Sequence, residues 1–312
     1  MKGTDHYSIW SIRLNNLIVI GCGLLACLLF LHFDSLTILD KDTYISIIEK
    51  FRVGNLASMV FTFNGIELIS ALVLFFLSIL PFSAEVCLAI LIFCYTTLFF
   101  SFFKNQNFIF LCFVIIIFGL YLVDLWLNQI KLSIGITLLF YTFVRLPESR
   151  AIKLILGPLA HIQLVIFSVL MMFDLSKLRN VLLIFAIFLV AFYQIDWLIK
   201  GDLAVSEKLR YYLYSDGRAT SQSVSILVSV KVIIFGLLAT THILVFKKYG
   251  LPEVVLVTTV IVFLSFIDVP SIAGRLNSVS IFFEPFVIAR HNKYIKSLYI
   301  IILVLGAFMK WA

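Results

Sequence analysis

Long apolar stretches alternate with short polar ones along the whole chain. The clearest apolar runs cover 14–33, 82–103, 107–127, 180–199 and 223–246. Each is close to or above the roughly 18 to 20 residues that an α-helix needs to cross the hydrocarbon core of a bilayer. No segment between them is long or polar enough for a soluble domain. The pattern therefore predicts an all-α, multi-pass membrane protein that forms a single integral membrane domain over 1–312.

The composition agrees with this pattern. Apolar residues make up 62% of the chain, charged residues only 13%, and the mean hydropathy is +1.11. Soluble domains carry roughly 25% charged residues. The net charge of +7 would suggest a nucleic-acid partner in a soluble protein. Here, however, Lys and Arg gather at the ends of the apolar runs, where lipid headgroups and topology explain them, so we expect no nucleic acid.

The number of crossings depends on where the basic residues lie. Counting every apolar run as a crossing gives about eleven and places about ten basic residues inside and six outside. In a second layout, 65–81 lies along the outer surface as a juxtamembrane helix, and 154–173 dips in from the cytoplasm and returns. This layout has about nine crossings, with about thirteen basic residues inside and three in the short outer loops. We prefer it because basic residues resist translocation, which puts the amino end inside.

The proposed dip contains helix-breaking residues. Gly157 and Pro158 interrupt the apolar segment, and His161 follows closely. A broken backbone at membrane depth persists only beside protein or water. The alternative is a single crossing kinked at Pro158.

In the preferred layout two longer polar stretches, about 34–64 and 200–222, face outward. Apolar residues at helical spacing in the first, Ile45, Ile48 and Phe51, predict an amphipathic interfacial helix.

Two aspartates, Asp40 and Asp42, open this helix. Asp40 and Tyr44 share a face because they are four residues apart, whereas Asp42 points elsewhere. One interpretation is a helix start, where an acidic residue is favoured by the helix dipole. The other is that one aspartate is a general base, or that both bind a divalent ion.

The second outer stretch interleaves cations with aromatic residues. These are Lys208, Arg210, Arg218, Tyr211, Tyr212 and Tyr214. Cations suit phosphate and aromatic rings suit sugar, although a solvated loop with interfacial tyrosines has the same composition.

Isolated charges also occur near membrane depth. Arg275 and Lys131 each begin a short apolar run. Burying such a group costs several kcal/mol unless an anion meets it, so a functional role is the first hypothesis. We expect Glu67 and Asp124 to pair with nearby cations, and assign them no chemistry.

The order of these features resembles the EpsG-like family of Wzy-type polysaccharide polymerases over most of the chain. The outline is also similar to lipid-linked glycosyltransferases of the GT-C class. The motifs are the Asp40, Tyr44 and Phe51 spacing, the helix NGIELISALVLFFLSIL, Ile130-Lys131, Leu159-Ala160-His161, Lys208 to Tyr211, and Pro270 to Arg275-Leu276. The chain departs from the family pattern at Lys131, where the family has arginine, and at Gly135, where alanine is common. A lysine lacks the planar fork that grips phosphate bidentately.

The resemblance implies a GT-C-like helical bundle in the bacterial inner membrane, with the active site facing the periplasm or exterior. The implied activity is that of a glycosyltransferase, the O-antigen polymerase type, which joins oligosaccharide repeat units carried on undecaprenyl pyrophosphate. Such polymerases serve the biosynthesis of lipopolysaccharide, capsule or exopolysaccharide. The implied partners are undecaprenyl-pyrophosphate-linked glycans, membrane lipid, a chain-length regulator and a repeat-unit flippase. No cofactor is needed, and a divalent metal is compatible with the paired aspartates but not required.

The resemblance also implies residue roles. Asp40, with Asp42 as alternative, would activate the acceptor hydroxyl, and His161 would bind substrate or transfer a proton. The remaining candidates would bind substrate: Arg275, Arg210 and Lys131 at the departing pyrophosphate, and Tyr44, Lys208 and Tyr211 nearby. Two other functions stay open: a flippase or transporter of lipid-linked saccharides, and another lipid-linked glycosyltransferase or ligase. A membrane acyltransferase is disfavoured, since His6 and His32 lack the arginine setting that its base would need.

Overall fold

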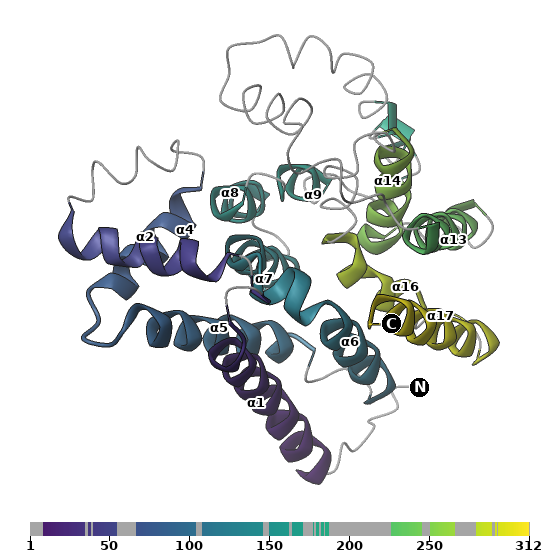
Figure 1. Ribbon diagram of the computed structural model, residues 1–312. Helices are drawn as coiled ribbons and strands as arrows, with labels where there is room; N and C mark the ends of the chain where they lie inside the picture. The colour runs from purple at the N-terminus through teal and green to yellow at the C-terminus, as the bar shows by residue number, and fades with distance from the viewer. Residues whose placement is uncertain are drawn as a thin grey trace. The chain divides into compact units, whose positions relative to one another are not determined.

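The computed structural model of the protein is built from helices (Figure 1). The residues it describes are 9–34, 37–38, 40–54, 67–103, 108–145, 150–161, 164–170, 177, 179–180, 182–183, 185–186, 226–244, 250–265, 279–288, 291 and 293–311. No strand occurs among them, which confirms the all-α class. Contacts divide the chain into two compact units, Met1–Ser168 and Val169–Ala312, which we describe separately. The single membrane domain stays a prediction.

The first unit contains most of the described helices. They are α1 (Ile9–His32), α2 (Lys41–Val53), α4 (Leu68–Ser78), α5 (Ala84–Ser101), α6 (Phe108–Tyr121), the π-helix η1 (Leu122–Leu127), α7 (Ile130–Arg145), α8 (Arg150–Ala160) and the beginning of α9 (Val165–Leu170), within which the boundary between the units falls. Helix α1 packs along α5, α2 packs on α4, and α7 packs against α8. The amphipathic helix expected in the first polar stretch is confirmed, because α2 buries Tyr44, Ile48 and Phe51.

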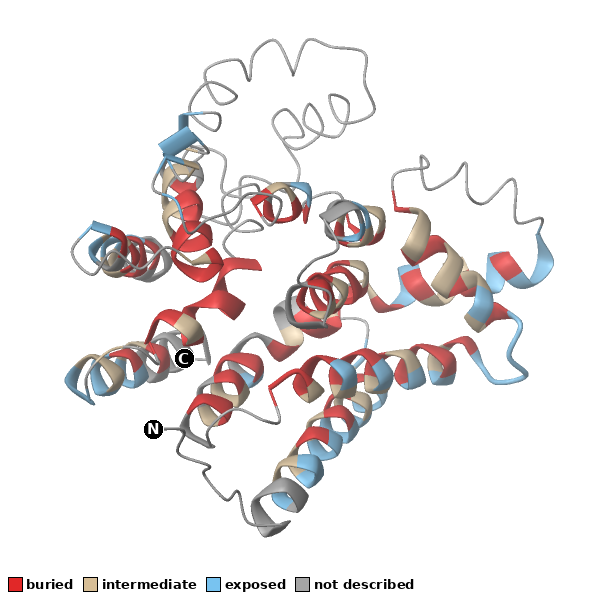
Figure 2. Ribbon diagram, turned by 180° about the vertical axis from the view of Figure 1, so that it is seen from behind, coloured by how far each residue is buried: buried red, intermediate tan, exposed pale blue. Residues whose placement is uncertain are grey.

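Helix α1 has a close-packed face and a leucine-rich face. A Cβ atom on Gly23 would lie only 2.2 Å from Oγ1 of Thr97, so the absence of a side chain lets α1 approach α5 closely. On other parts of α1, Leu17 and Leu28 are 66% and 61% exposed (Figure 2). Small residues at helix contacts and large apolar residues facing outward are typical of helices surrounded by lipid.

Two helices in this unit are long and apolar enough to cross a membrane, Leu14–His32 and Ala84–Ser101. They match the predicted runs 14–33 and 82–103. Together with the apolar composition, they favour a membrane protein. The predicted nine to eleven crossings are not confirmed by the described helices.

Helices α4 and α8 are each too short to cross a bilayer. Each has 11 residues, which corresponds to roughly 16 Å of helix. The hydrocarbon core is about 30 Å thick. The length of α4 agrees with the expectation that 65–81 is not a crossing.

The chain reverses direction around His161. A Cβ atom on Gly157 would lie 3.1 Å from Oγ of Ser168, although a straight helix would separate residues eleven apart by roughly 16 Å. Helix α8 ends at Ala160, and α9 begins at Val165. The chain therefore turns back, as the proposed dip requires and a continuous crossing does not. It does so after Ala160, however, and the expected interruption at Gly157 and Pro158 is wrong, because both residues lie within α8. The depth of this turn in a membrane stays a prediction.

The second unit contains α13 (Ile226–Leu244), α14 (Leu251–Ser265), the 3₁₀ turn η3 (Ile281–Phe283), α16 (Glu284–Ile288) and α17 (Lys293–Trp311). Helix α13, which matches the predicted run 223–246, packs on α14. A Cβ atom on Gly236 would lie 2.1 Å from Cγ2 of Val260, so this contact also depends on a glycine. The hydroxyl of Tyr299 donates to Oε2 of Glu284 at 2.8 Å and links α17 to α16.

Candidate active site

Four residues from different parts of the first unit are linked by contacts that centre on one carboxylate. Oε2 of Glu67, the residue before α4, lies 2.6 Å from Nζ of Lys131 at the start of α7. Its other oxygen, Oε1, lies 3.7 Å from Nε2 of His161, which follows α8. The hydroxyl of Tyr44, on α2, accepts a hydrogen bond from the backbone N–H of Lys131 at 3.4 Å. We call Tyr44, Glu67, Lys131 and His161 the Glu67 cluster.

The Glu67 cluster is buried except at its lysine. Glu67 is 3% exposed, Tyr44 4% and His161 8%. The Lys131 side chain is 25% exposed. A carboxylate removed from water is strongly destabilising unless it is paired, so Glu67 depends on the ammonium group of Lys131. Lys131 is also the member of the cluster that solvent reaches most easily.

A hydrogen bond and a glycine hold the α4 and α8 parts of the cluster together. The hydroxyl of Ser70 donates to the backbone carbonyl of Ala160 at 2.7 Å, which fixes α4 against the end of α8. A Cβ atom on Gly135 would lie 3.5 Å from Cβ of His161 and 2.4 Å from Cδ1 of Leu164. The glycine of α7 therefore leaves room for the turn that carries His161.

The π-helix η1 sets where α7 begins. The carbonyl of Trp126 accepts hydrogen bonds from the Tyr95 hydroxyl at 2.9 Å and from the Ser133 hydroxyl at 3.1 Å. The indole N–H of Trp126 donates to Oγ1 of Thr96 at 2.8 Å. Short π-helices are frequent at functional sites. These bonds connect η1, α5 and α7, and they fix the helix start that carries Lys131.

The arrangement is suited to proton transfer. An ionised carboxylate beside an imidazole favours the imidazolium form, which makes the histidine a better proton acceptor. The 3.7 Å separation is longer than a hydrogen bond. Catalytic hydrogen bonds are often long in unliganded proteins and shorten when substrate binds.

The paired aspartates occupy the start of α2. Asp40 occupies the N-cap position, but its side chain makes no capping hydrogen bond. The structure therefore does not support the interpretation that Asp40 caps the helix. Asp42 lies in the first turn and is exposed, whereas Tyr44 is buried. The two aspartates therefore differ in environment, as their spacing predicts. Their chemistry stays a prediction.

The residue between them has a structural role that the sequence did not suggest. Lys41 is 6% exposed. Its ammonium group donates to the carbonyls of Phe30 at 3.0 Å and Phe33 at 2.8 Å, and lies 2.5 Å from Oε1 of Glu85. A cation at the carboxyl end of α1 and an acid in the first turn of α5 both complement the helix dipoles. Lys41 thus connects α1, α2 and α5.

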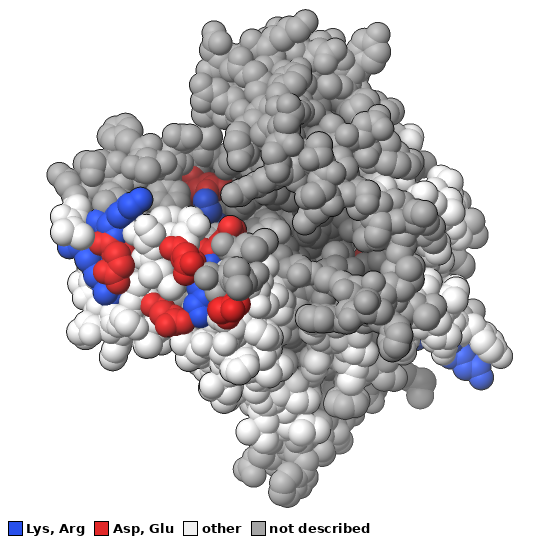
Figure 3. All heavy atoms as spheres, in the orientation of Figure 1, with Lys and Arg blue, Asp and Glu red and all other residues white. Residues whose placement is uncertain are grey.

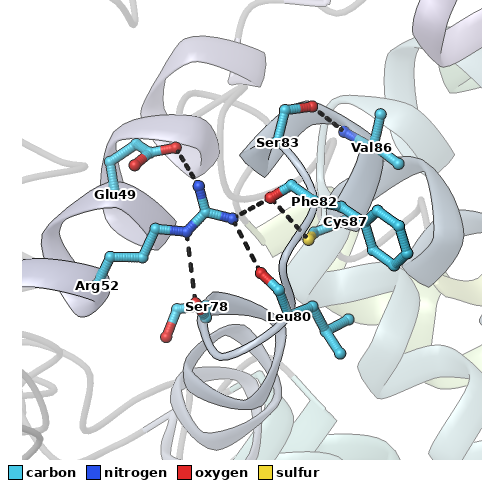
Figure 4. A network of polar contacts seen from close by, with 8 residues as sticks. All are labelled: Glu49, Arg52, Ser78, Leu80, Phe82, Ser83, Val86 and Cys87. Atoms are coloured by element: carbon cyan, nitrogen blue, oxygen red, sulfur yellow. Dashed lines mark hydrogen bonds and ion pairs between the residues drawn. The ribbon is translucent and has the colours of Figure 1, made fainter.

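Arg52 performs a similar structural role at the other end of α2 (Figure 4). Its guanidinium group contacts Oε1 of Glu49 at 2.9 Å and the carbonyls of Ser78 at 3.4 Å and Leu80 at 3.5 Å. It also donates to the carbonyl of Phe82. These carbonyls lie at and after the end of α4, where cations are favoured. Figure 3 shows the charged side chains of this unit gathered over α2 and its neighbours, while the described surface over α1 is uncharged.

The structure thus brings together Tyr44, Lys131 and His161 from the predicted site. Lys208, Arg210, Tyr211 and Arg275 lie outside the described residues, so their roles stay predictions. The pairing of Glu67 with a cation is confirmed, but its place at the centre of the cluster was missed. The sequence contained one signal for this role. Glu67 is a carboxylate directly before an apolar helix, and the first polar residue after it on that helix is Ser70.

Among the described residues no group of three or more His, Cys, Asp or Glu side chains is arranged to hold a metal ion. Comparisons of the chain with protein-family models, with curated proteins and with solved structures gave no match.

Proposed function

We propose that the protein is a membrane glycosyltransferase that polymerises oligosaccharide repeat units carried on undecaprenyl pyrophosphate. The site would face the outer side of the bacterial inner membrane in a chain of nine to eleven crossings. This orientation rests on the charge distribution of the sequence. The resemblance to EpsG-like polymerases supplies the substrate class.

The observation that carries the proposal is the convergence of Tyr44, Lys131 and His161. These residues come from separate motifs of the resemblance, 87 positions apart for Tyr44 and Lys131. Lys131 and His161 nevertheless meet at one buried carboxylate, and the Tyr44 hydroxyl bonds the backbone N–H of Lys131. Residues selected only for their chemistry have no reason to meet unless they share a site, so the convergence supports a common function.

The proposed reaction has two chemical demands, and the cluster suits one of them. An acceptor hydroxyl must lose a proton as it attacks the anomeric carbon, for which His161 beside Glu67 is suited. The departing pyrophosphate must be stabilised by cations. Arg210 and Arg275 would meet this demand, and their placement beside the cluster is part of the proposal.

The experiment is deletion of the gene followed by examination of the surface glycan. We expect glycan that stops at one repeat unit and regains its length when the wild-type gene is returned. His161→Ala should leave single repeats, whereas Lys50→Ala, which changes an exposed lysine of α2, should restore full length.

The alternatives give different products. Loss of a flippase would leave repeat units on the inner side of the membrane. Loss of a ligase would leave full-length polymer on its lipid carrier. Either product would contradict the proposal.

A further inference from the structure

The centre of the cluster is a residue with no role in the expected mechanism. Glu67 is 3% exposed, so a substrate cannot reach its carboxylate without passing its neighbours. Each oxygen faces a different group, Oε2 the ammonium of Lys131 and Oε1 the imidazole of His161. Glu67 can therefore act on a reaction through these two side chains.

The lysine favours the ionised form of the carboxylate. A buried carboxyl group would otherwise bind a proton, because burial disfavours its charged form. An ammonium group at 2.6 Å from Oε2 opposes this and favours the carboxylate. The lysine implied by the resemblance to be a phosphate ligand is thus already engaged by an anion of the protein.

The negative charge then acts on His161. The backbone of this residue is fixed, because its N–H donates to the Gly157 carbonyl at 2.9 Å and its carbonyl accepts from the Leu164 N–H at 3.0 Å. The ring is therefore anchored at the turn while the imidazole faces Glu67. Glu67, before α4, faces the ring at 3.7 Å. Lys131 on α7 pairs with Glu67, and the hydroxyl of Tyr44 on α2 accepts from the backbone N–H of Lys131.

We propose that Glu67 is a positioning residue that makes His161 the proton acceptor of the transfer reaction, with Lys131 as the counter-ion of Glu67 rather than a ligand of pyrophosphate. This inference rests on the proposed function. The acceptor hydroxyl oxygen forms the bond to the anomeric carbon, and the bond from that carbon to the phosphate oxygen breaks. The electron pair leaves with pyrophosphate, and the hydroxyl proton moves to Nδ1 of His161, the ring nitrogen that does not face Glu67. Glu67 stabilises the resulting positive charge from the Nε2 side.

The experiment compares three full-length variants in membranes: Glu67→Gln, Glu67→Asp and the double variant Glu67→Gln/Lys131→Met. The double variant removes both charges and so avoids leaving one buried ion without its partner. We expect Glu67→Gln to lower polymer formation about 100-fold. The double variant should stay folded but equally inactive, and Glu67→Asp, which retains the charge, should recover part of the activity.

A second measurement does not depend on polymer formation. Diethyl pyrocarbonate modifies neutral imidazole, so the pH dependence of His161 modification, followed by peptide mass spectrometry, reports when this ring loses its proton. In Glu67→Gln the midpoint should move roughly one pH unit lower, because the imidazolium form loses its carboxylate. Glu49→Gln, a change at an exposed carboxylate, should leave the midpoint unchanged.

The outcomes separate the two proposals. Wild-type activity in the double variant, or an unchanged modification midpoint in Glu67→Gln, would overturn the role of Glu67 and leave it a purely structural ion pair. Absence of polymer formation by the wild-type protein would instead refute the proposed function. The modification profile would then still decide whether Glu67 controls the protonation of His161.

Discussion

Two carboxylate–cation pairs of the first unit, one between separate segments and one within α2, differ mainly in burial. Glu67 pairs with Lys131 at 2.6 Å and is 3% exposed. Glu49 pairs with Arg52 at 2.9 Å, but its side chain is 50% exposed. Both contacts are short. Only the first, however, removes a charge from water and places an imidazole on the other side of it.

Under the proposed function, this difference separates a chemical role from a structural one. Around Arg52 the remaining contacts are backbone carbonyls at and beyond the end of α4, which a cation stabilises without further chemistry (Figure 4). Around Glu67 they are side chains that can gain or lose protons. Charge density alone would point to the surface around α2 as the functional region, whereas a buried carboxylate with an imidazole beside it points to the Glu67 cluster.

The largest expected effect comes from Lys131→Met. This change leaves the Glu67 carboxylate buried beside a neutral side chain. Removing one partner of a buried pair costs about 3 kcal/mol, at the lower end of the usual range because Lys131 is itself partly exposed. We expect this loss in the free energy of unfolding measured by denaturant titration in detergent micelles.

The matched control is Lys50→Met, which removes an exposed lysine from α2. It should change the unfolding free energy by less than about 0.5 kcal/mol. Equal losses in the two variants would show that Glu67 does not depend on Lys131 for its charge.

A smaller effect is expected from Lys41→Met. Lys41 is a buried cation that does not belong to the Glu67 cluster. The change leaves the carbonyls of Phe30 and Phe33 without its ammonium group. Hydrogen bonds to a charged group contribute about 2 kcal/mol, so we expect a loss of that size in the unfolding free energy.

Polymer formation per folded molecule should not change in Lys41→Met, since the contacts of Lys41 are to α1 and α5. The control is Glu85→Gln, which neutralises the carboxylate partner of Lys41, a side chain that is 41% exposed. It should lower the free energy of unfolding by less than about 1 kcal/mol, as is usual for exposed ion pairs. A loss of activity at constant folding in Lys41→Met would extend the functional region to the start of α2.

Much of the first unit could be predicted from the sequence because apolar spacing encodes it directly. The runs 14–33 and 82–103 became α1 and α5, and the spacing of Ile48 and Phe51 predicted the buried face of α2. Gly157 and Pro158 predicted an interruption close to the reversal of the chain, although α8 continues through both and ends at Ala160. Each of these features depends on residues close together in sequence.

The centre of the cluster could not be predicted in the same way. Glu67 and Lys131 are 64 residues apart, and which acid meets which cation depends on how α4, α7 and α8 pack. Lys41 was overlooked for a related reason. Between two aspartates it looks like a solvated charge, and only the end of α1, eleven residues away from it at Phe30, gives it a buried partner.

The smallest effect is expected from Glu49→Gln. The variant removes an ion pair between two partly exposed side chains three residues apart on α2, where solvent screens the charges and side-chain entropy opposes the contact. We expect a change of about 0.5 kcal/mol or less in the free energy of unfolding. Arg52→Met should cost more, about 1 kcal/mol, because it also removes the cation from the carbonyls after α4. If Glu49→Gln were instead as destabilising as Lys131→Met, burial could not be what distinguishes the two pairs, and the reason for placing the chemistry at Glu67 would be lost.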